Sequence, residues 1–249
     1  MVTLKSRREI EIMRDAGRIV AEILQALRPH CLPGVKTREL DRIAEEETLR
    51  RNARPAFKGY RGYPASLCAS VNQEVVHGIP GNRELKEGDI VSLDYGVIYN
   101  GYYGDASTTV PVGQVAPEVA ELLKVTEESL YLGIEQVVAG NHLSDISRVI
   151  QKHAEAHGYG IVKELGGHGI GRRMHEEPMV LNYVTGSLGI KLQPGLVLAL
   201  EPMLNLGTDG VRTLQDGWTV VTRDGKPSAH FEHTVALTET GAEILTRAV

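Results

Sequence analysis

The sequence lacks the features that mark secreted, membrane-spanning and nucleic-acid-binding proteins. Its two cysteines, Cys31 and Cys68, are too few for a disulfide framework and favour a reducing compartment. No apolar run approaches the roughly 18 residues that a transmembrane helix needs. The first residues have no apolar core of a secretory signal, and a net charge of −5 gives no general attraction for nucleic acid. We therefore expect a cytoplasmic protein with no membrane association and no specific nucleic-acid partner.

One short run of the chain is basic, with Arg50, Arg51 and Arg54 within five residues. Two interpretations stay open for this run. It is the solvated end of a helix, or it is a weak docking patch for a polyanion.

Four segments have the apolar spacing of helices. The first starts with a capping box, in which Ser6 is followed three residues later by Glu9. Thr37 is expected to cap the second helix. The expected helices cover residues 6–27, a segment from 37 that includes Leu40 and Ala44, residues 117–137, and a segment that ends near Gly158.

The second half of the chain weakly repeats the first. Gly34 and Gly140 occupy matching places, as do Leu40 and Ile146, at one constant offset. We therefore expect a single domain over residues 1–249, with similar halves of about 1–115 and 116–249. Helices in blocks, with hairpins between them, predict an α+β fold.

Two β-rich runs joined by Asn100 and Gly101 predict a hairpin. A two-residue turn pairs Tyr99 with Tyr102, and the same register makes Asp94 and Asp105 diagonal neighbours on one face. Such neighbours lie about 7–8 Å apart. Two carboxylates there repel one another unless a cation or a shared proton lies between them. Taken alone, however, the pair is better explained by a solvated acidic surface.

Three later segments favour the cation. His168 stands among glycines, Glu201 follows an apolar strand-like run, and Glu232 lies in another apolar segment. A buried carboxylate needs compensation, because burying its charge alone costs several kcal/mol. Four carboxylates and one imidazole suit divalent cations such as Mn²⁺, Fe²⁺, Co²⁺, Ni²⁺ or Zn²⁺, and so many acidic ligands point to two ions.

In this order, the five residues resemble the ligand set of the pita-bread metallopeptidases, and most closely that of the type I methionine aminopeptidases. The resemblance covers essentially the whole chain. Its motifs are AFKGYRGYP at 56–64, SVNQEVVHGIP at 70–80, GDIV at 88–91, GGHGIG at 166–171, HEEP at 175–178, EPM at 201–203, DGW at 216–218 and FEHT at 231–234. It implies two pseudo-symmetric halves of antiparallel sheet covered by helices, with a metal site between them.

The resemblance also implies the activity and the metal ligands. The enzyme would remove the N-terminal methionine from nascent proteins when the second residue is small. Asp94 would bind one metal, Asp105 and Glu232 would bridge two, and His168 and Glu201 would complete the shell of the second. A metal-bound water or hydroxide would attack the scissile carbonyl.

Three residues would act on the substrate according to the same resemblance. Glu201 would accept the proton of the attacking water and pass it to the leaving amide nitrogen. His175 would hydrogen-bond the carbonyl or the oxyanion, and His77 would contact the scissile amide nitrogen.

The family's pocket for the first side chain corresponds here to an apolar and aromatic set. Phe57 and Met174 depart from the commonest bacterial pattern, which has Cys and Phe at those places, but both stay apolar. The pocket residues are Phe57, Tyr60, Tyr63, Cys68, His77, Met174 and Trp218. Asn72 and Ser228 are implied to lie near a monovalent cation.

Two alternatives differ from this interpretation. An X-Pro dipeptidase or aminopeptidase P would use the same five ligands but usually carries an additional N-terminal domain, for which we expect no room before Asp94. A non-catalytic binding relative would lose ligands, whereas all five are present. The resemblance further implies a monomer that associates transiently with the ribosome.

Overall fold

The computed structural model describes residues 2–248, and within them four long helices lie in two pairs along the chain. The first pair is α1 (Arg7–Leu27) and α2 (Thr37–Arg50), and the second is α3 (Pro117–Glu135) and α4 (Leu143–Ala156). Two short 3₁₀ turns also occur. Arg28–His30 directly follows α1, and Tyr60–Gly62 comes after α2 in the chain. The paired arrangement agrees with the helices expected from apolar spacing.

The predicted capping box at the start of α1 is confirmed. The Ser6 hydroxyl accepts a hydrogen bond from the Glu9 main-chain nitrogen at 3.4 Å, and the Ser6 nitrogen donates to the Glu9 carboxylate at 2.9 Å. These two bonds satisfy donors that the first turn of a helix leaves free.

The predicted cap at Thr37 is wrong. Lys36 is the cap residue of α2, and Thr37 is already helical. The Thr37 hydroxyl instead accepts a hydrogen bond from the Gly81 nitrogen at 2.8 Å and lies 3.3 Å from the Gly81 carbonyl oxygen. This long-range partner competes with the cap, so that the hydroxyl fastens α2 to the loop before the central hairpin. The third expected helix is also shorter than predicted, because α3 ends at Glu135 and Val137 lies beyond it.

The central hairpin has the predicted register. Strands β4 (Ile90–Tyr99) and β5 (Tyr102–Pro111) pair Tyr99 with Tyr102 and Asp94 with Ser107. Asn100 and Gly101 have φ values of 48° and 81°, as a two-residue turn of this twist requires. On the other side of β4, the edge is shared by the short strands β1 (Arg54–Pro55) and β2 (Cys68–Val71).

Three more antiparallel sheets complete the fold. One has the order β15-β14-β9-β7-β8, another β13-β10-β6, and the third β11-β12-β3. Their strands are β3 (Glu74–Val76), β6 (Gly160–Ile161), β7 (Gly167–Gly169), β8 (Glu176–Val180), β9 (Val197–Leu200), β10 (Met203–Asn205), β11 (Val211–Thr213), β12 (Val220–Thr222), β13 (Ser228–His230), β14 (His233–Thr238) and β15 (Gly241–Ile244). The antiparallel strands and blocked helices confirm the α+β prediction.

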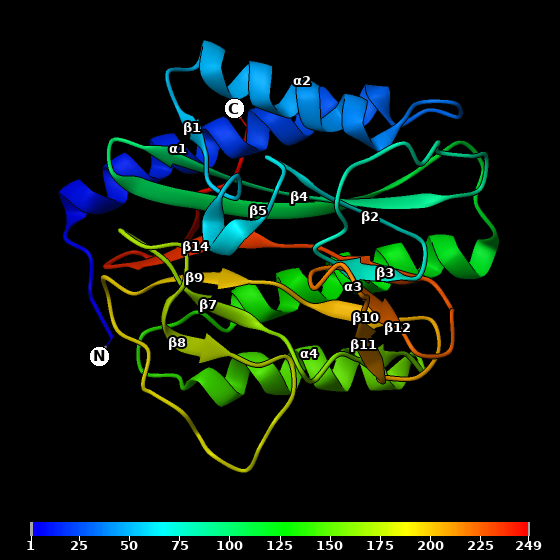
Figure 1. Cartoon of the computed structure of the whole chain (residues 1–249). Coiled ribbons are helices and arrows are strands. Elements are labelled where there is room, and N and C mark those ends of the chain that lie inside the picture. The colour runs from blue at the N-terminus through cyan, green and yellow to red at the C-terminus, as the bar shows by residue number, and fades with distance from the viewer. Residues whose placement is uncertain (1, 249) are drawn as a thin grey trace.

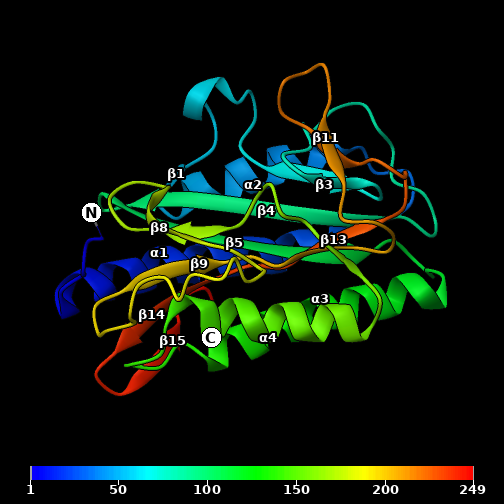
Figure 2. The same ribbon diagram turned by 90° about the horizontal axis from the view of Figure 1, so that it is seen from below.

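The strands form a middle layer between the two helix pairs. Figure 1 shows α1 and α2 above the strands, and α3 and α4 below them. One apolar core, which includes Ile23 and Leu93, lies between the first pair and the hairpin, and another, which includes Ile146 and Leu198, lies over the second pair. Figure 2 shows that the loop after β1 and the hairpin that begins with β11 project on the same side of this layer.

Across residues 2–248, no helix has both the length and the apolar character needed to cross a membrane.

Candidate metal centre and substrate cavity

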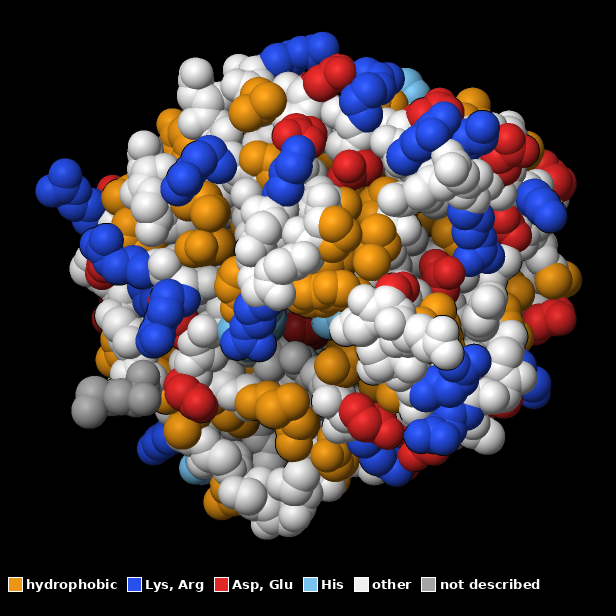
Figure 3. Space-filling view, viewed as in Figure 1, with side chains coloured by type: hydrophobic (Ala, Val, Ile, Leu, Met, Phe, Trp, Pro, Cys, Tyr) orange, Lys and Arg blue, Asp and Glu red, His pale blue; other side chains and the backbone are white. Residues whose placement is uncertain are grey.

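A cavity of about 290 Å³ opens between the loop after β1 and the strands of the middle layer. Figure 3 shows it as a hollow with hydrophobic side chains at its rim and acidic and histidine side chains deep inside. The structure brings together all the predicted ligands and every predicted substrate contact except Met174. The predicted residues that line the cavity are Phe57, Tyr60, Tyr63, Cys68, His77, Asp94, Asp105, His168, His175, Glu201, Trp218 and Glu232.

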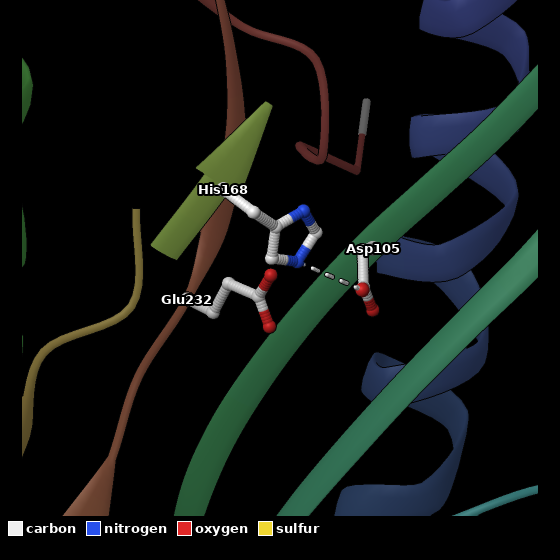
Figure 4. Close-up of side chains that lie close together, drawn as sticks. All are labelled: Asp105, His168 and Glu232. Carbon is white, nitrogen blue, oxygen red and sulfur yellow. Dashed lines mark ion pairs between the residues drawn. The ribbon is translucent and has the colours of Figure 1, made fainter. Parts of the chain in front are cut away.

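Three of the predicted ligands form a compact cluster at the floor. Asp105 on β5, His168 on β7 and Glu232 just before β14 point toward one another, as Figure 4 shows. One ligand atom from each lies within 4.8 Å of the others. The Nε2 atom of His168 is 3.9 Å from Asp105 Oδ2 and 3.7 Å from Glu201 Oε1. This spacing leaves room for a cation among the side chains.

Main-chain contacts bring Glu232 beside Asp105 although the two are far apart in sequence. The Ser107 nitrogen donates to the Glu232 carbonyl oxygen at 3.3 Å, and the Glu232 nitrogen donates to the Ser107 carbonyl oxygen at 3.0 Å. The Thr234 hydroxyl also donates to the Asp105 carbonyl oxygen at 2.7 Å. These contacts join the central hairpin to β14 and fix both carboxylates.

The glycines around His168 serve close packing of main chains. A methyl group on Gly167 would lie 2.2 Å from the Ala199 carbonyl oxygen, and one on Gly169 equally close to that of Glu177. Glycine therefore lets β7 lie tightly between β8 and β9, so that His168 reaches the floor of the cavity.

Burial strongly perturbs the carboxyl groups of the cluster. It raises the pKa of Asp94 to about 7 and the pKa of Glu201 to about 8. The pKa values of Asp105 and Glu232 are raised well above the ordinary range, first by burial and then by the neighbouring carboxylates. Without a cation, these groups therefore hold protons near neutral pH.

His168 has the protonation that a metal ligand needs. Its Nδ1 atom donates to the Gly169 carbonyl oxygen at 2.9 Å, which leaves the lone pair on Nε2, facing the carboxylates. Burial lowers the pKa of His168 to about 4, so the ring is neutral.

The residues present fit a divalent cation. Three buried oxygen atoms, Asp94 Oδ1, Asp105 Oδ1 and Glu232 Oε1, have no hydrogen-bond partner within residues 2–248. Buried polar atoms without partners are rare and call for an explanation. A cation would satisfy these atoms and neutralise the clustered charge.

His175 and His77 line the same cavity as the cluster of Asp105, His168 and Glu232. The Tyr60 hydroxyl lies 2.9 Å from His175 Nδ1, and the His175 and His168 rings are 4.3 Å apart. Burial lowers the pKa of His77 to about 4, and it lowers that of His175, with Arg61 adding to the effect. Both rings are therefore neutral and can either donate or accept a hydrogen bond at neutral pH.

An aromatic wall lies beside the carboxylates. The Tyr63 and Trp218 rings meet edge to face with centroids 5.1 Å apart, and Trp218 also meets His77 at 6.3 Å. The Tyr63 hydroxyl is held by the carbonyl oxygens of Leu67 and Gly78 at 3.1 and 3.0 Å. Cys68 is buried next to Tyr63. The wall is thus rigid and largely apolar.

Met174 differs from the expectation. It is fully buried and does not line the cavity. Its terminal methyl group and the Phe57 ring both crowd Gly96, where an added methyl group would lie 2.9 Å from each. Met174 therefore supports the Phe57 side of the cavity from behind.

Asn72 and Ser228 are neighbours, because the Ser228 nitrogen donates to the Asn72 carbonyl oxygen at 2.9 Å.

The sequence prediction missed His230, which is 1% exposed and whose Nε2 atom lies 3.6 Å from Glu201 Oε2. Its position two residues before Glu232 was a usable signal, because alternate residues of an extended chain share a face. It also missed Arg61 at the cavity mouth.

Comparison with known proteins identifies the family. The profile of metallopeptidase family M24 matches residues 11–239. The chain belongs to this family. As an M24 metallopeptidase it uses a divalent metal, and the cluster of Asp105, His168 and Glu232 is the candidate site.

Similar M24 proteins confirm the resemblance inferred from the motifs. A Bacillus subtilis protein named methionine aminopeptidase 1 is 52% identical over 247 residues, covering 99% of this chain and 100% of that protein. The crystal structure of the Thermotoga maritima methionine aminopeptidase superposes with a TM-score of 0.97 at 44% identity, covering 99% of this chain and 100% of the other. The pita-bread fold is thereby confirmed.

A prolidase from Pyrococcus furiosus is a more distant relative in structure. It matches with a TM-score of 0.81 at 24% identity, and the match covers 99% of this chain but 66% of the prolidase. At that identity the likeness shows the shared fold alone.

Proposed function

We propose that this enzyme is a metal-dependent aminopeptidase that removes the N-terminal methionine from polypeptides whose second residue is small. One observation carries the proposal: a single cavity holds both the carboxylate and imidazole cluster and the aromatic wall of Tyr63 and Trp218. The cluster supplies a place for the hydrolytic metal, and the wall supplies a surface for an unbranched apolar side chain.

The proposed ligands hold two divalent cations. Asp94 would hold one, Asp105 and Glu232 would serve both, and His168 and Glu201 would hold the other. Support comes from the unpartnered carboxylate oxygens and from the His168 lone pair that faces them. Cations bound there supply Lewis acidity and acidify water. The ligand chemistry suits Co, Mn, Fe, Zn or Ni.

The proposed catalytic steps assign separate tasks to three side chains. Glu201, next to the cluster, takes a proton from the attacking water and transfers it to the leaving amine. His175, held by Tyr60, donates a hydrogen bond to the oxygen that becomes negative in the transition state. His77 contacts the scissile amide nitrogen and holds it in line for protonation.

The methionine side chain is proposed to lie against Tyr63, Trp218 and Cys68, with Tyr60 and Phe57 closing the pocket. Contacts between a thioether and aromatic rings contribute about 0.3–1.5 kcal/mol each. Met174 keeps Phe57 in place from behind. A monovalent cation is proposed near the main chain of Asn72 and Ser228.

Tripeptide hydrolysis tests the function and separates it from the alternatives. We expect release of methionine from Met-Ala-Ser, much slower release from Met-Lys-Ser, and no cleavage of Ala-Pro. Cleavage of Ala-Pro without release of methionine would favour a prolidase-like enzyme. A protein that binds metal but cleaves none of the three would favour the non-catalytic alternative.

The proposed setting is the cytoplasm, where a monomeric single domain of residues 1–249 acts transiently at the ribosome. The support is the substrate, since N-terminal methionines first appear on nascent chains. The basic run offers little for docking, because Arg51 pairs with Glu22 at 2.9 Å and with Glu47 at 2.5 Å, and Arg50 pairs with Glu47. Co-sedimentation with ribosomes at increasing salt tests the association.

A further inference from the structure

The buried imidazole of His230 is outside the proposed ligand set but lies next to Glu201, one of the proposed ligands. His230 ends β13, is 1% exposed and does not line the cavity. Among residues 2–248, neither of its ring nitrogens has a hydrogen-bond partner. A buried polar side chain without partners costs free energy, so its place beside the carboxylates needs a reason.

Main-chain contacts fix the position of this ring. The main-chain nitrogen of His230 donates a hydrogen bond to the Thr109 hydroxyl at 2.9 Å. The His230 carbonyl oxygen lies 2.8 Å from Thr109 Oγ1 and 3.3 Å from Ser107 Oγ. Thr109 is in turn 2.8 Å from the Ser92 hydroxyl. Hydroxyl groups of the central hairpin therefore hold both the nitrogen and the carbonyl oxygen of His230.

The ring faces the carboxylate to which the proposed mechanism assigns two tasks. His230 Nε2 is 3.6 Å from Glu201 Oε2, while Glu201 Oε1 is 3.7 Å from His168 Nε2. Glu201 thus has one oxygen on the side of the metal cluster and the other on the side of His230. Burial lowers the pKa of His230, and the nearby charge of Asp94 opposes that shift.

We infer that His230 is a positioning residue: in the metal-loaded enzyme its Nε2–H donates a hydrogen bond to Glu201 Oε2, which keeps Oε1 directed at the metals. The inference rests on the proposed role of Glu201 as a ligand. The present separation of 3.6 Å lies just beyond hydrogen-bond range, so a small movement of Glu201 on binding a cation completes the bond. Substituting a residue that hydrogen-bonds a metal ligand typically lowers metal affinity or activity by about 10- to 100-fold.

Two substitutions separate the hydrogen bond from simple packing. The amide nitrogen of His230→Gln can replace the imidazole Nε2–H, whereas His230→Leu fills much of the space without a donor. By calorimetric titration with Mn²⁺, we expect His230→Leu to bind about 10- to 100-fold more weakly than wild type. His230→Gln is expected to stay within a few-fold of wild type, and kcat for Met-Ala-Ser should follow the same order.

A measurement on the unmodified protein guards against misfolding of the Leu variant. In ¹⁵N NMR spectra of Zn²⁺-loaded wild type, His230 should show a protonated Nε2 whose proton is shifted downfield. Its signals are assigned by their absence from the spectrum of His230→Gln. A metal-bound Nε2, or equal metal affinity in the Leu variant and wild type, would overturn the inference. So would equal losses in the Gln and Leu variants.

The same experiments distinguish this inference from the proposed function. If the wild type bound no Mn²⁺, the proposed ligand set would fail and His230 would lose its role with it. If the wild type bound Mn²⁺ and the two variants followed the expected order, the inference would stand even if Met-Ala-Ser were not cleaved.

Discussion

Asp105 and Glu232 meet at the floor of the cavity from opposite halves of the chain. Each has an oxygen without a hydrogen-bond partner among the described residues, and each has a raised pKa. Carboxyl groups with strongly perturbed pKa values cluster at functional sites. The proposed use is to bridge two cations.

Asp105→Asn should therefore abolish hydrolysis of Met-Ala-Ser, because an amide removes the negative charge that draws the two cations together. Metal content measured on the purified variant should fall as well. The exposed Asp15→Asn substitution on α1 is the matched control and should change neither quantity. Full activity of the Asp105 variant would rule out a bridging role.

His77 is expected to act on the substrate without holding metal. His77→Ala should lower kcat by about 100-fold or more, the typical contribution of a proton-transfer or polarising group, while metal content stays near that of wild type. His77 has a left-handed φ of 59°. His77→Asn, which tolerates that backbone better than Ala, separates loss of the ring from strain. Loss of metal in both variants would contradict this assignment.

Between elements, the N-terminal segment is fastened to the strand that follows His175. Lys5 Nζ lies 2.8 Å from the Glu176 carboxylate at the start of β8, and both side chains are less than a tenth exposed. The Lys5 nitrogen also donates to the Gly195 carbonyl oxygen at 2.7 Å. The segment before α1 therefore supports one side of the cavity.

Removing one partner of this buried ion pair should destabilise the protein. Lys5→Met leaves Glu176 charged and unpaired, which typically costs about 3–5 kcal/mol. Urea denaturation of the metal-loaded protein measures this change. Arg7→Met, which removes an exposed pair with Glu11, should cost less than about 1 kcal/mol. Equal effects of the two substitutions would show that burial adds nothing to the Lys5 pair.

The elements predicted best from sequence are those with local determinants. The capping box at Ser6 and the turn at Asn100 and Gly101 fix α1 and the central hairpin with contacts a few residues apart. The predicted capping role of Thr37 is wrong because its hydrogen-bond partner, Gly81, is distant in sequence. The strands after Gly158 are mostly three to six residues long. Several of them, such as β9 with β14 and β10 with β6, pair with strands distant in sequence, so apolar spacing alone could not give their order.

For the whole molecule, the burial of the carboxylates makes metal-free protein sensitive to pH. The pKa values of Asp94 and Glu201 are raised in the folded state, to about 7 and about 8. A raised carboxyl pKa means that the folded state binds more protons than the unfolded state. Stability from these groups is therefore present at low pH and is lost as pH rises through 7 to 8.

Metal-free protein should accordingly melt at a lower temperature at pH 8.5 than at pH 6.0. A loss of 1 kcal/mol corresponds to a decrease of about 2–4 °C in a domain of this size. Saturation with Mn²⁺ should remove most of this pH dependence, because the cation then holds the carboxylates ionised. Metal-free protein that gained stability toward pH 8.5 would contradict the account.

That the five proposed ligands share one cavity was predictable, because they are charged or imidazole side chains in apolar or Gly-rich surroundings. The contact between His230 and Glu201 was not, because it depends on how β13 lies against the central hairpin. Likewise, the place of Met174 behind Phe57 depends on crowding around Gly96, which no local pattern reveals.

Bound divalent cations are proposed to make this fold an aminopeptidase for N-terminal methionine. The most direct measurement is methionine release from Met-Ala-Ser by chelator-treated protein as Mn²⁺ is added back. We expect no release of methionine without metal and recovery of activity as the site fills. Full activity in protein shown to be metal-free would contradict it.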